Sequence, residues 1–519
     1  MNEKFYSFFR KYGLITVLII AIFFRFYNLS ITPPGLYPDE AINGNNASQA
    51  LSTGDYKVFY PENNGREGLF INIQSFLLYI FKVHAPWVLR SESAFWGVIT
   101  ILGIYLLTQY IFRKRKYSHL VAFLSSFFTA ISFWHVDFSR MGFRAIMAPA
   151  ILVWGIYLLI LSLELLKEQK INYKKIILMS VLGGSIYGLG MYSYIAYRAT
   201  PILIIFIYLL YKWIYKIDFK KIFTSFAFYV IASLIVFSPL GIYFIKNPGD
   251  FFGRTSEISI TSSASPLKDL SSNIIKTLGM FDFKGDSNWR HNISGSPEIY
   301  WFVGIFFIIG IFSLIPKIKS SAINLSEKQD ESEESEKNKE FEFFWWILIF
   351  WMFMAMLPVV FSNESIPHAL RSILMIPPSY MLAGLGALAF INYFQKKCSQ
   401  EKIFYATLII VGVFLIFQSY ASYFIFWAQN PNVANAFSEN YVQLGNQLNQ
   451  MPQSIKKYVI VNADGVLVNG IPMPAETIMF ITDTFTQEKQ KEKNIYYLLP
   501  SQEKEINDKN AVVLYLEPK

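Results

Sequence analysis

The sequence predicts an all-α polytopic membrane protein, with about eleven membrane-spanning helices and a small C-terminal α/β domain. Hydrophobic residues make up 53% of the 519 residues, charged residues make up 16%, and the mean hydropathy is +0.33, which is too apolar for an ordinary soluble protein. Apolar runs long enough to cross the hydrocarbon core recur along most of the chain. In the tail, the β-rich runs "KYVIVN", "TIMFIT", "NIYYLL" and "AVVLYL" alternate with polar stretches that are compatible with helices.

The apolar segments that have the length and composition of spans follow one another through most of the chain. They are 13–31, 91–112, 118–136, 145–166, 176–195, 200–215, 222–245, 298–316, 341–361, 372–392 and 403–425. Segment 68–82 is too short for a span and contains Asn72 and Gln74, so we expect a juxtamembrane helix in the interface. No small-residue cleavage site follows the first apolar run, which predicts a retained span and not a cleaved signal peptide.

The distribution of Lys and Arg orients these spans. If 68–82 is not a span, the cation-rich connections all fall on the side of the N-terminus, namely 113–116, 167–175, 216–221 and 395–402. The alternate short connections contain only isolated arginines. The positive-inside bias therefore predicts a multi-pass protein of the cell membrane, with a cytoplasmic N-terminus and an extracytoplasmic C-terminus.

This topology divides the chain into a transmembrane domain, 1–427, and an extracytoplasmic α/β domain, 428–519. Two long loops of the first domain, 32–90 and 246–297, share the external face with the tail. On the inner face, segment 317–340 is a charged linker, and we expect its run 326–340 to be solvated and disordered because of its many Glu, Lys and Ser residues.

Charge and cysteine content exclude several classes of protein. The net charge of +9 is explained by cations at the cytoplasmic ends of spans, so we do not expect a nucleic-acid-binding surface. The single cysteine, Cys398, excludes both an intramolecular disulfide and a cysteine-based metal cluster within one chain.

An acidic pair, Asp39 and Glu40, follows the first span in "YPDEA" (37–41) and opens a stretch that is compatible with a helix. Two interpretations are open. The pair caps the N-terminus of that helix, where acidic residues are common, or one carboxylate acts as a general base on a substrate at the outer leaflet.

The other external loops favour the second interpretation, because they carry cations and hydrogen-bonding groups close to helix ends. These motifs are "NNGREG" (63–68), "DFSRMGFRA" (137–145), "GDSNWRHN" (285–292) and "PHALRS" (367–372). A single arginine at a membrane boundary is more often a headgroup anchor, and for Arg25, inside the first span, we favour no functional role.

In this order, the motifs resemble those of the GT-C fold, and within it the protein-O-mannosyltransferase-like glycosyltransferases (family 39), which include the aminoarabinose transferases that act on lipid A. The similarity covers roughly residues 10–425. Two features depart from the family pattern. Many relatives have an arginine shortly after the acidic pair, which is followed here by "AINGNN", and the Glu-Lys pair of the aminoarabinose transferases is replaced by Arg66-Glu67, in reversed order.

The resemblance implies inverting transfer of a sugar from a polyprenyl-phosphate donor to a hydroxyl of a protein, lipid or glycan. It makes Asp39 the expected base, and Glu40 its orienting partner or a sugar ligand. Asp39 and Glu40 are also the candidate ligands of a divalent cation such as Mg or Mn, although the metal requirement is left open. The candidate phosphate-binding residues, whose guanidinium groups can engage two oxygens at once, are Arg66, Arg144, Arg371 and Arg140. The candidate substrate-binding residues are Glu67, His368, Arg290, His291 and Asn288.

Two other classes of protein stay open at this point. A transporter or lipid flippase would need ionisable groups or broken helices near the midplane of the membrane, whereas these polar motifs gather at the outer boundary. A structural protein that presents the tail domain leaves the external arginines unexplained. The sequence does not identify the sugar, the acceptor, the oligomeric state or the ligand of the tail.

Overall fold

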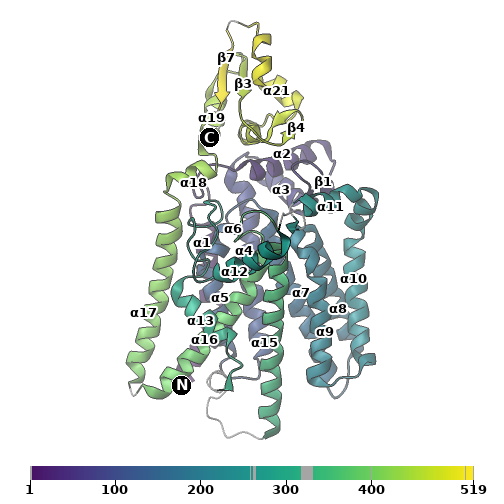
Figure 1. Ribbon diagram of the computed structural model, residues 1–519, viewed down its shortest axis with the longest axis vertical. Helices are drawn as coiled ribbons and strands as arrows, with labels where there is room; N and C mark the ends of the chain where they lie inside the picture. The colour runs from purple at the N-terminus through teal and green to yellow at the C-terminus, as the bar shows by residue number, and fades with distance from the viewer. Residues whose placement is uncertain are drawn as a thin grey trace.

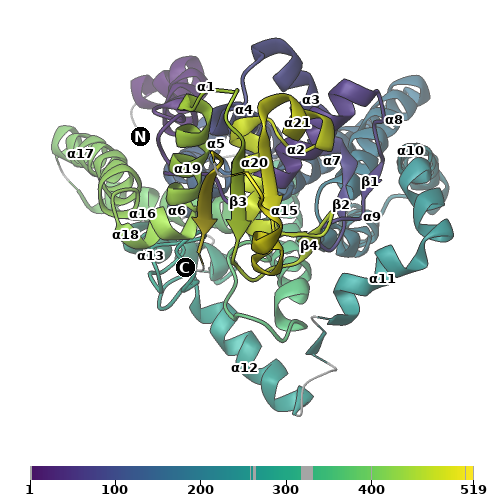
Figure 2. The same cartoon turned by 90° about the horizontal axis from the view of Figure 1, so that it is seen from above.

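The computed structural model describes residues 3–257, 259–260, 265–316, 331–398, 400–508 and 510–517. Long helices stand side by side as a bundle, and a small α/β unit covers one end of it (Figure 1). In the view from above that end, α11 (Pro248–Glu257) and α12 (Pro266–Gly279) extend outward along one edge of the bundle (Figure 2). We call the covered end the α2 end, after the helix α2 (Pro38–Thr53) that lies there.

The prediction of a polytopic helical membrane protein is confirmed. Within the described residues, nine helical segments are long and apolar enough to cross a membrane: Phe5–Phe26, Pro86–Ile111, Arg144–Lys167, Tyr173–Tyr192, Ile195–Tyr215, Phe219–Lys246, Glu334–Val360, Ile373–Lys397 and Glu401–Trp427. Each of them overlaps one of the predicted spans. The remaining two predicted spans contain shorter helices, α5 (Ser118–Ile131) and α13 (Trp301–Ile311).

The helix α5 is short because Ser132 ends it and caps the next helix, α6 (Phe133–Phe138). The Ser132 hydroxyl accepts a hydrogen bond from the backbone N–H of His135 at 3.2 Å, as expected of a serine at a helix N-terminus. The other long helices of the bundle are α1 (Glu3–Phe26), α4 (Pro86–Ile111), α7 (Met147–Glu164), α8 (Tyr173–Leu189), α9 (Pro201–Tyr215), α10 (Phe219–Lys246), α15 (Glu331–Val360), α16 (Ile376–Lys397) and α17 (Glu401–Tyr420).

The helix α16 lies at the centre of the bundle, where it packs against α5 and α13. Glycines allow this close approach: a Cβ atom at Gly386 would meet the carbonyl oxygen of Phe306, and one at Gly384 would meet the side chain of Ser125. Small residues at such contacts let helix backbones pack tightly where the hydrophobic effect contributes little.

At the α2 end, the chain after α1 forms α2, a two-stranded antiparallel hairpin and the helix α3 (Gly68–Phe81). The hairpin pairs β1 (Phe59–Tyr60) with β2 (Arg66–Glu67), with Tyr60 opposite Arg66. The predicted juxtamembrane helix corresponds to α3, which has 14 residues and is too short to span the hydrocarbon core.

The α/β unit contains a parallel sheet in the order β6-β3-β7, made of β6 (Ile495–Leu498), β3 (Lys457–Val461) and β7 (Val512–Leu516). A small antiparallel pair joins β4 (Leu467–Val468) to β5 (Ile471–Pro472). The helices of the unit are α18 (Pro431–Ala436), α19 (Glu439–Gln450), α20 (Glu476–Thr482) and α21 (Gln487–Lys493).

One of the β-rich runs of the tail is a helix. "TIMFIT" forms most of α20, although the other three runs form β3, β6 and β7. Every residue of α20 is buried, because the helix packs between α19 and α2. A helix that is apolar all round shows no 3.6-residue period, so its sequence looks like a buried strand.

The prediction of a disordered linker is wrong for residues 331–340, and residues 317–330 lie outside the described residues. Residues 331–340 form the first turns of α15, because a run of Glu and Lys favours helix and leads without a break into an apolar span. Lys114, in the connection between α4 and α5, forms ion pairs with Glu336 at 2.7 Å and Glu340 at 3.5 Å.

Candidate functional site

A cavity of about 230 Å³ opens at the α2 end, between α2, the β1–β2 hairpin, the segments just before α7 and α9, the helix α11 and the loop before α16. Its lining includes six of the candidate site residues that the sequence indicates, drawn from four separate motifs. They are Asp39, Arg66, Glu67, Arg144, His368 and Arg371. We call this cavity the α2 cavity.

Asp39 lies in the first turn of α2 and is partly buried, with its carboxylate at the α2 cavity. The side-chain amide of Asn63 donates a hydrogen bond to Asp39 Oδ1 at 2.5 Å. Because Asn63 comes from the loop between β1 and β2, the hairpin helps to orient the carboxylate that the sequence singles out as the base.

Glu40 is wholly buried and does not line the α2 cavity, so the structure does not bring it to the position that its predicted catalytic and metal-binding roles require. Arg90 donates two hydrogen bonds to its carboxylate, at 2.9 and 3.0 Å. The backbone N–H groups of Gly142 and Tyr37 donate two more, at 2.7 and 3.2 Å. A buried charge needs such partners, and the capping interpretation therefore holds for Glu40.

Arg66 is almost fully buried, and its guanidinium donates to Asn43 Oδ1 at 2.8 Å and to Asn46 Oδ1 at 2.5 Å. Burial, followed by the nearby charge of Arg144, lowers the pKa of Arg66 to about 10, so the side chain stays protonated at neutral pH. Its nearest carboxylate, Glu62, is 3.7 Å away. Two neutral amides and this more distant carboxylate hold the cation, and Arg66 borders the α2 cavity.

Glu67 bridges two arginines in the lining of the α2 cavity. Its carboxylate contacts Arg144 at 2.7 Å and Arg198 at 3.4 Å. One negative charge therefore faces two guanidinium groups, so this part of the cavity wall carries an excess of positive charge.

Arg371 is held at the cavity by Glu364, at 2.7 Å, and by the hydroxyl of Ser362. In total, four arginines and three carboxylates line the α2 cavity: Arg66, Arg144, Arg198 and Arg371, with Asp39, Glu67 and Asp250. The lining therefore favours a ligand with a negatively charged group.

The remaining candidates do not line the α2 cavity. The structure does not place Arg140 where a phosphate would bind. Its guanidinium is fully buried and donates to the main-chain carbonyls of Phe24, Arg25, Tyr27 and Thr32, and so satisfies acceptors where α1 ends. Arg25 is structural as well, since it donates to the carbonyls of Ala130 and Thr129.

Three candidates come from the 285–292 motif, which folds as a turn beside the cavity. Asn288 Oδ1 accepts a hydrogen bond from the backbone N–H of Arg290 at 3.0 Å, so it shapes the turn. The guanidinium of Arg290 lies over the ring of Tyr37, 3.9 Å from its centroid.

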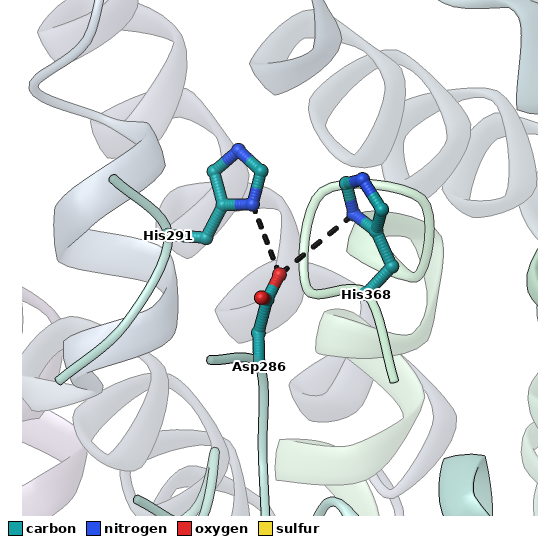
Figure 3. A group of neighbouring side chains, drawn as sticks. All are labelled: Asp286, His291 and His368. Carbon is teal, nitrogen blue, oxygen red and sulfur yellow. Dashed lines mark hydrogen bonds and ion pairs between the residues drawn. The ribbon is translucent and has the colours of Figure 1, made fainter. Parts of the chain in front are cut away.

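His291 belongs to a cluster with Asp286 and His368, which Figure 3 shows with both imidazole rings turned toward the carboxylate. Asp286 Oδ2 lies 2.9 Å from Nδ1 of His291 and 3.8 Å from Nδ1 of His368. The three ligand atoms lie within 4.8 Å of one another. Two imidazoles and a carboxylate suit zinc or a similar divalent transition metal.

The electrostatics of this cluster fit such a ligand set. Burial lowers the pKa of both His291 and His368, so both rings are neutral at neutral pH. Burial also acts to raise the pKa of Asp286, but the interactions with His291 and His368 and the hydrogen bond from the Asn288 backbone together outweigh it, and the pKa is lowered. Among the described residues, this cluster brings three metal-ligating atoms close together, whereas Asp39 and Glu40 belong to no such group.

Sequence reasoning missed several residues of the site. Asn43 and Asn46 stand four and seven positions after Asp39, a spacing that places all three on one face of a helix, and this signal was present in "DEAINGNN". Arg90 and Arg198 have no comparable local signal. Their partners, Glu40 and Glu67, are 50 and 131 residues away in the sequence.

No family model matches the sequence, and no curated protein matches it. Among solved structures, the chain is similar to the Archaeoglobus fulgidus oligosaccharyltransferase in the apo form, with 13% identity and a TM-score of 0.52 over 96% of this chain and 66% of that chain. It is also similar to ArnT from Cupriavidus metallidurans bound to undecaprenyl phosphate, with 12% identity and a TM-score of 0.50 over 94% of this chain and 90% of that chain. Both structures are GT-C-fold glycosyltransferases, and this chain has the GT-C fold.

Proposed function

We propose that this protein is a membrane glycosyltransferase that moves a sugar from a polyprenyl-phosphate donor to an acceptor hydroxyl. The observation that carries the proposal is the α2 cavity, at one end of the membrane bundle. Its lining brings together the carboxylate of Asp39 and the guanidinium groups of Arg66, Arg144 and Arg371. The solved structure of ArnT with undecaprenyl phosphate supports a polyprenyl-linked donor for a chain of this fold.

In the proposed reaction, Asp39 accepts the proton of the acceptor hydroxyl as its oxygen attacks the anomeric carbon. The bond between that carbon and the phosphate oxygen breaks, the configuration inverts, and the lipid phosphate leaves with an additional negative charge. Asn63 orients the base through its hydrogen bond to Asp39. Arg66, Arg144 and Arg371 stabilise the charge that develops on the phosphate.

We assign the α2 end to the extracytoplasmic face of the cell membrane, because cation-rich connections mark the other end. We also assign residues 1–427 to the transferase domain and 428–519 to an external domain that selects the acceptor. The contact between α20 and α2 supports this role: Asn45 donates to the carboxylate of Glu476 at 2.7 Å, two positions from Asn43 in the cavity wall.

The test is transfer of sugar from a defined polyprenyl-phosphate donor by the full-length protein in nanodiscs. Asp39→Asn keeps the shape of the side chain and removes its basicity, so transfer should fall by roughly 10²-fold or more while donor binding persists. The matched control is Asp55→Asn, which changes a largely exposed aspartate shortly after α2. Near-normal turnover of Asp39→Asn would refute the role of Asp39. Transport of a lipid across the bilayer with no transfer from any donor would refute the enzyme.

A further inference from the structure

A second cavity lies at the end of the bundle opposite to α2, where the first turns of α1 meet the connection between α4 and α5. Figure 1 shows the N-terminus at this end and the α/β unit at the other. The cavity has a volume of about 790 Å³. Its lining contains five basic side chains and no acidic one: Arg10, Lys11, Arg113, Arg115 and Lys116. We call it the basic cavity.

Only some of these cations are committed to protein partners. Arg113 forms an ion pair with Glu164 at 2.8 Å, and Arg115 donates to the carbonyl of Lys337. Within the described part of the chain, no carboxylate lies within ion-pair distance of Arg10 or Lys11, and the ammonium of Lys11 lies 5.0 Å from the ring centroid of Tyr12. The basic cavity therefore carries positive charge that the fold itself does not neutralise.

An apolar stripe on α1 runs from the basic cavity into the membrane. Phe8 and Tyr12 line the cavity, and Ile15 and Ile19 continue from them at helical spacing on the same face. Their exposed fractions are 49%, 43%, 59% and 62%. From Phe8 to Ile19, a helix rises by about 16 Å, which is roughly half the thickness of the hydrocarbon core.

We propose that the basic cavity binds the phosphate headgroup of an anionic glycerophospholipid of the membrane, with an acyl chain of that lipid along the stripe Phe8, Tyr12, Ile15 and Ile19. Charge selects the headgroup, because basic pockets between membrane helices attract anionic lipids. The stripe favours a lipid over free phosphate, because a free phosphate has no apolar part that could cover these side chains. This site is separate from the α2 cavity and does not depend on the proposed transferase activity.

The binding test uses the full-length protein after delipidation in detergent. Phosphatidylglycerol should raise Tm and should be retained in native mass spectra, whereas phosphatidylcholine with the same acyl chains should do neither. Inorganic phosphate at millimolar concentration should leave Tm unchanged. An equal shift with phosphatidylcholine would refute selection by charge, and an equal shift with inorganic phosphate would show an anion site without a lipid.

The variant test compares two triple substitutions of equal charge. Arg10→Gln with Lys11→Gln and Lys116→Gln should weaken the binding of phosphatidylglycerol by about tenfold or more, because each cation near an anionic headgroup contributes to the attraction. The control changes Lys174, Lys220 and Lys221 to Gln; these exposed lysines lie outside the basic cavity at connections of the same end. An equal loss in the control would refute the site in favour of general surface charge. If the triple variant does not fold, Lys11→Gln alone decides, with an expected loss of about threefold.

Discussion

Arg66 and Arg140, both predicted on the external face of the membrane, are almost fully buried and yet have different roles. Arg140 donates to main-chain carbonyls where α1 ends, so its hydrogen bonds are used for folding. Arg66 donates to the side-chain amides of Asn43 and Asn46 and borders a cavity. Hydrogen-bond partners, and not burial, therefore separate the structural cation from the candidate for binding phosphate.

We expect Arg66→Gln to lower kcat for sugar transfer by on the order of 10²-fold, with a smaller change in KM, because charge on the leaving phosphate grows in the transition state. The kcat of Arg66→Lys should lie between those of the unsubstituted protein and of Arg66→Gln, since lysine keeps the charge and loses the two-pronged geometry of the guanidinium. Kinetics with a defined lipid donor measure both values. Lys57→Gln, on the same hairpin segment and exposed, is the control. An effect on KM alone would make Arg66 a lipid anchor.

For the cluster of Asp286, His291 and His368, we expect Zn²⁺ to raise Tm of the chelator-treated protein by an amount that grows with concentration. The shift should persist to lower pH than at a site of ordinary histidines, because burial lowers the pKa of both imidazoles. His291→Ala should abolish it. His84→Ala, a partly exposed histidine outside the cluster, should retain it. A shift of the same size in both variants would place the ion elsewhere.

Among the elements, α2 explains how the site is built. One turn of this helix supplies Glu40 to the interior and Asp39 to the cavity, and the following turns supply Asn43 and Asn46 to Arg66 and Asn45 to α20. Its helical spacing could be predicted, because it depends on local sequence alone. The partners could not, because Arg90 and Glu476 join α2 through tertiary contacts that leave no local pattern.

The contact between α2 and α20 should depend on pH. Burial, as the largest effect, raises the pKa of Glu476 to about 7. Between about pH 4.5 and 7, the folded protein holds a proton at this carboxyl that the unfolded chain has lost, so stability falls as the pH rises, by up to about 3 kcal/mol. Protection factors of α20, which correct for the intrinsic rise of amide exchange with pH, should therefore be lower at pH 8 than at pH 5.

Glu476→Gln keeps the hydrogen-bonding shape and removes the charge, so protection of α20 should become independent of pH and should increase at pH 8. Glu488→Gln, at an exposed position of α21, should leave the pH dependence intact. Equal protection factors at pH 5 and pH 8 in the unsubstituted protein would contradict a titrating Glu476.

At the scale of the whole molecule, hydropathy predicted the fold well. The spans are continuous in sequence and their apolar character does not depend on tertiary contacts, so the predicted positions agree with the helices of the bundle. The polar surface that approaches the α2 cavity comes from six separate parts of the chain. Six of the candidate residues line it and Glu40 and Arg140 do not, because their direction is set by neighbours far away in sequence.

The proposed orientation of the bundle can be tested with single cysteines in a Cys398→Ser background. Cysteine at Asp55 or at Asp464, both exposed at the α2 end, should react with an impermeant thiol reagent on intact cells. Cysteine at Ser335, exposed near the start of α15, should react only after the membrane is opened. The reverse pattern would place the α2 cavity in the cytoplasm.

The hydrogen bond between Asn45 and Glu476 joins residues that are 431 positions apart. At a synthesis rate of roughly 5–20 residues per second, α2 waits about 20–90 s for the segment that covers it. Throughout that interval, the ribosome is still occupied and the first helices are already in the bilayer, while the surface of α2 that later meets α20 is uncovered. Quality control during membrane insertion therefore has a long period in which to engage α2, and a chain truncated before residue 476 presents the same surface permanently.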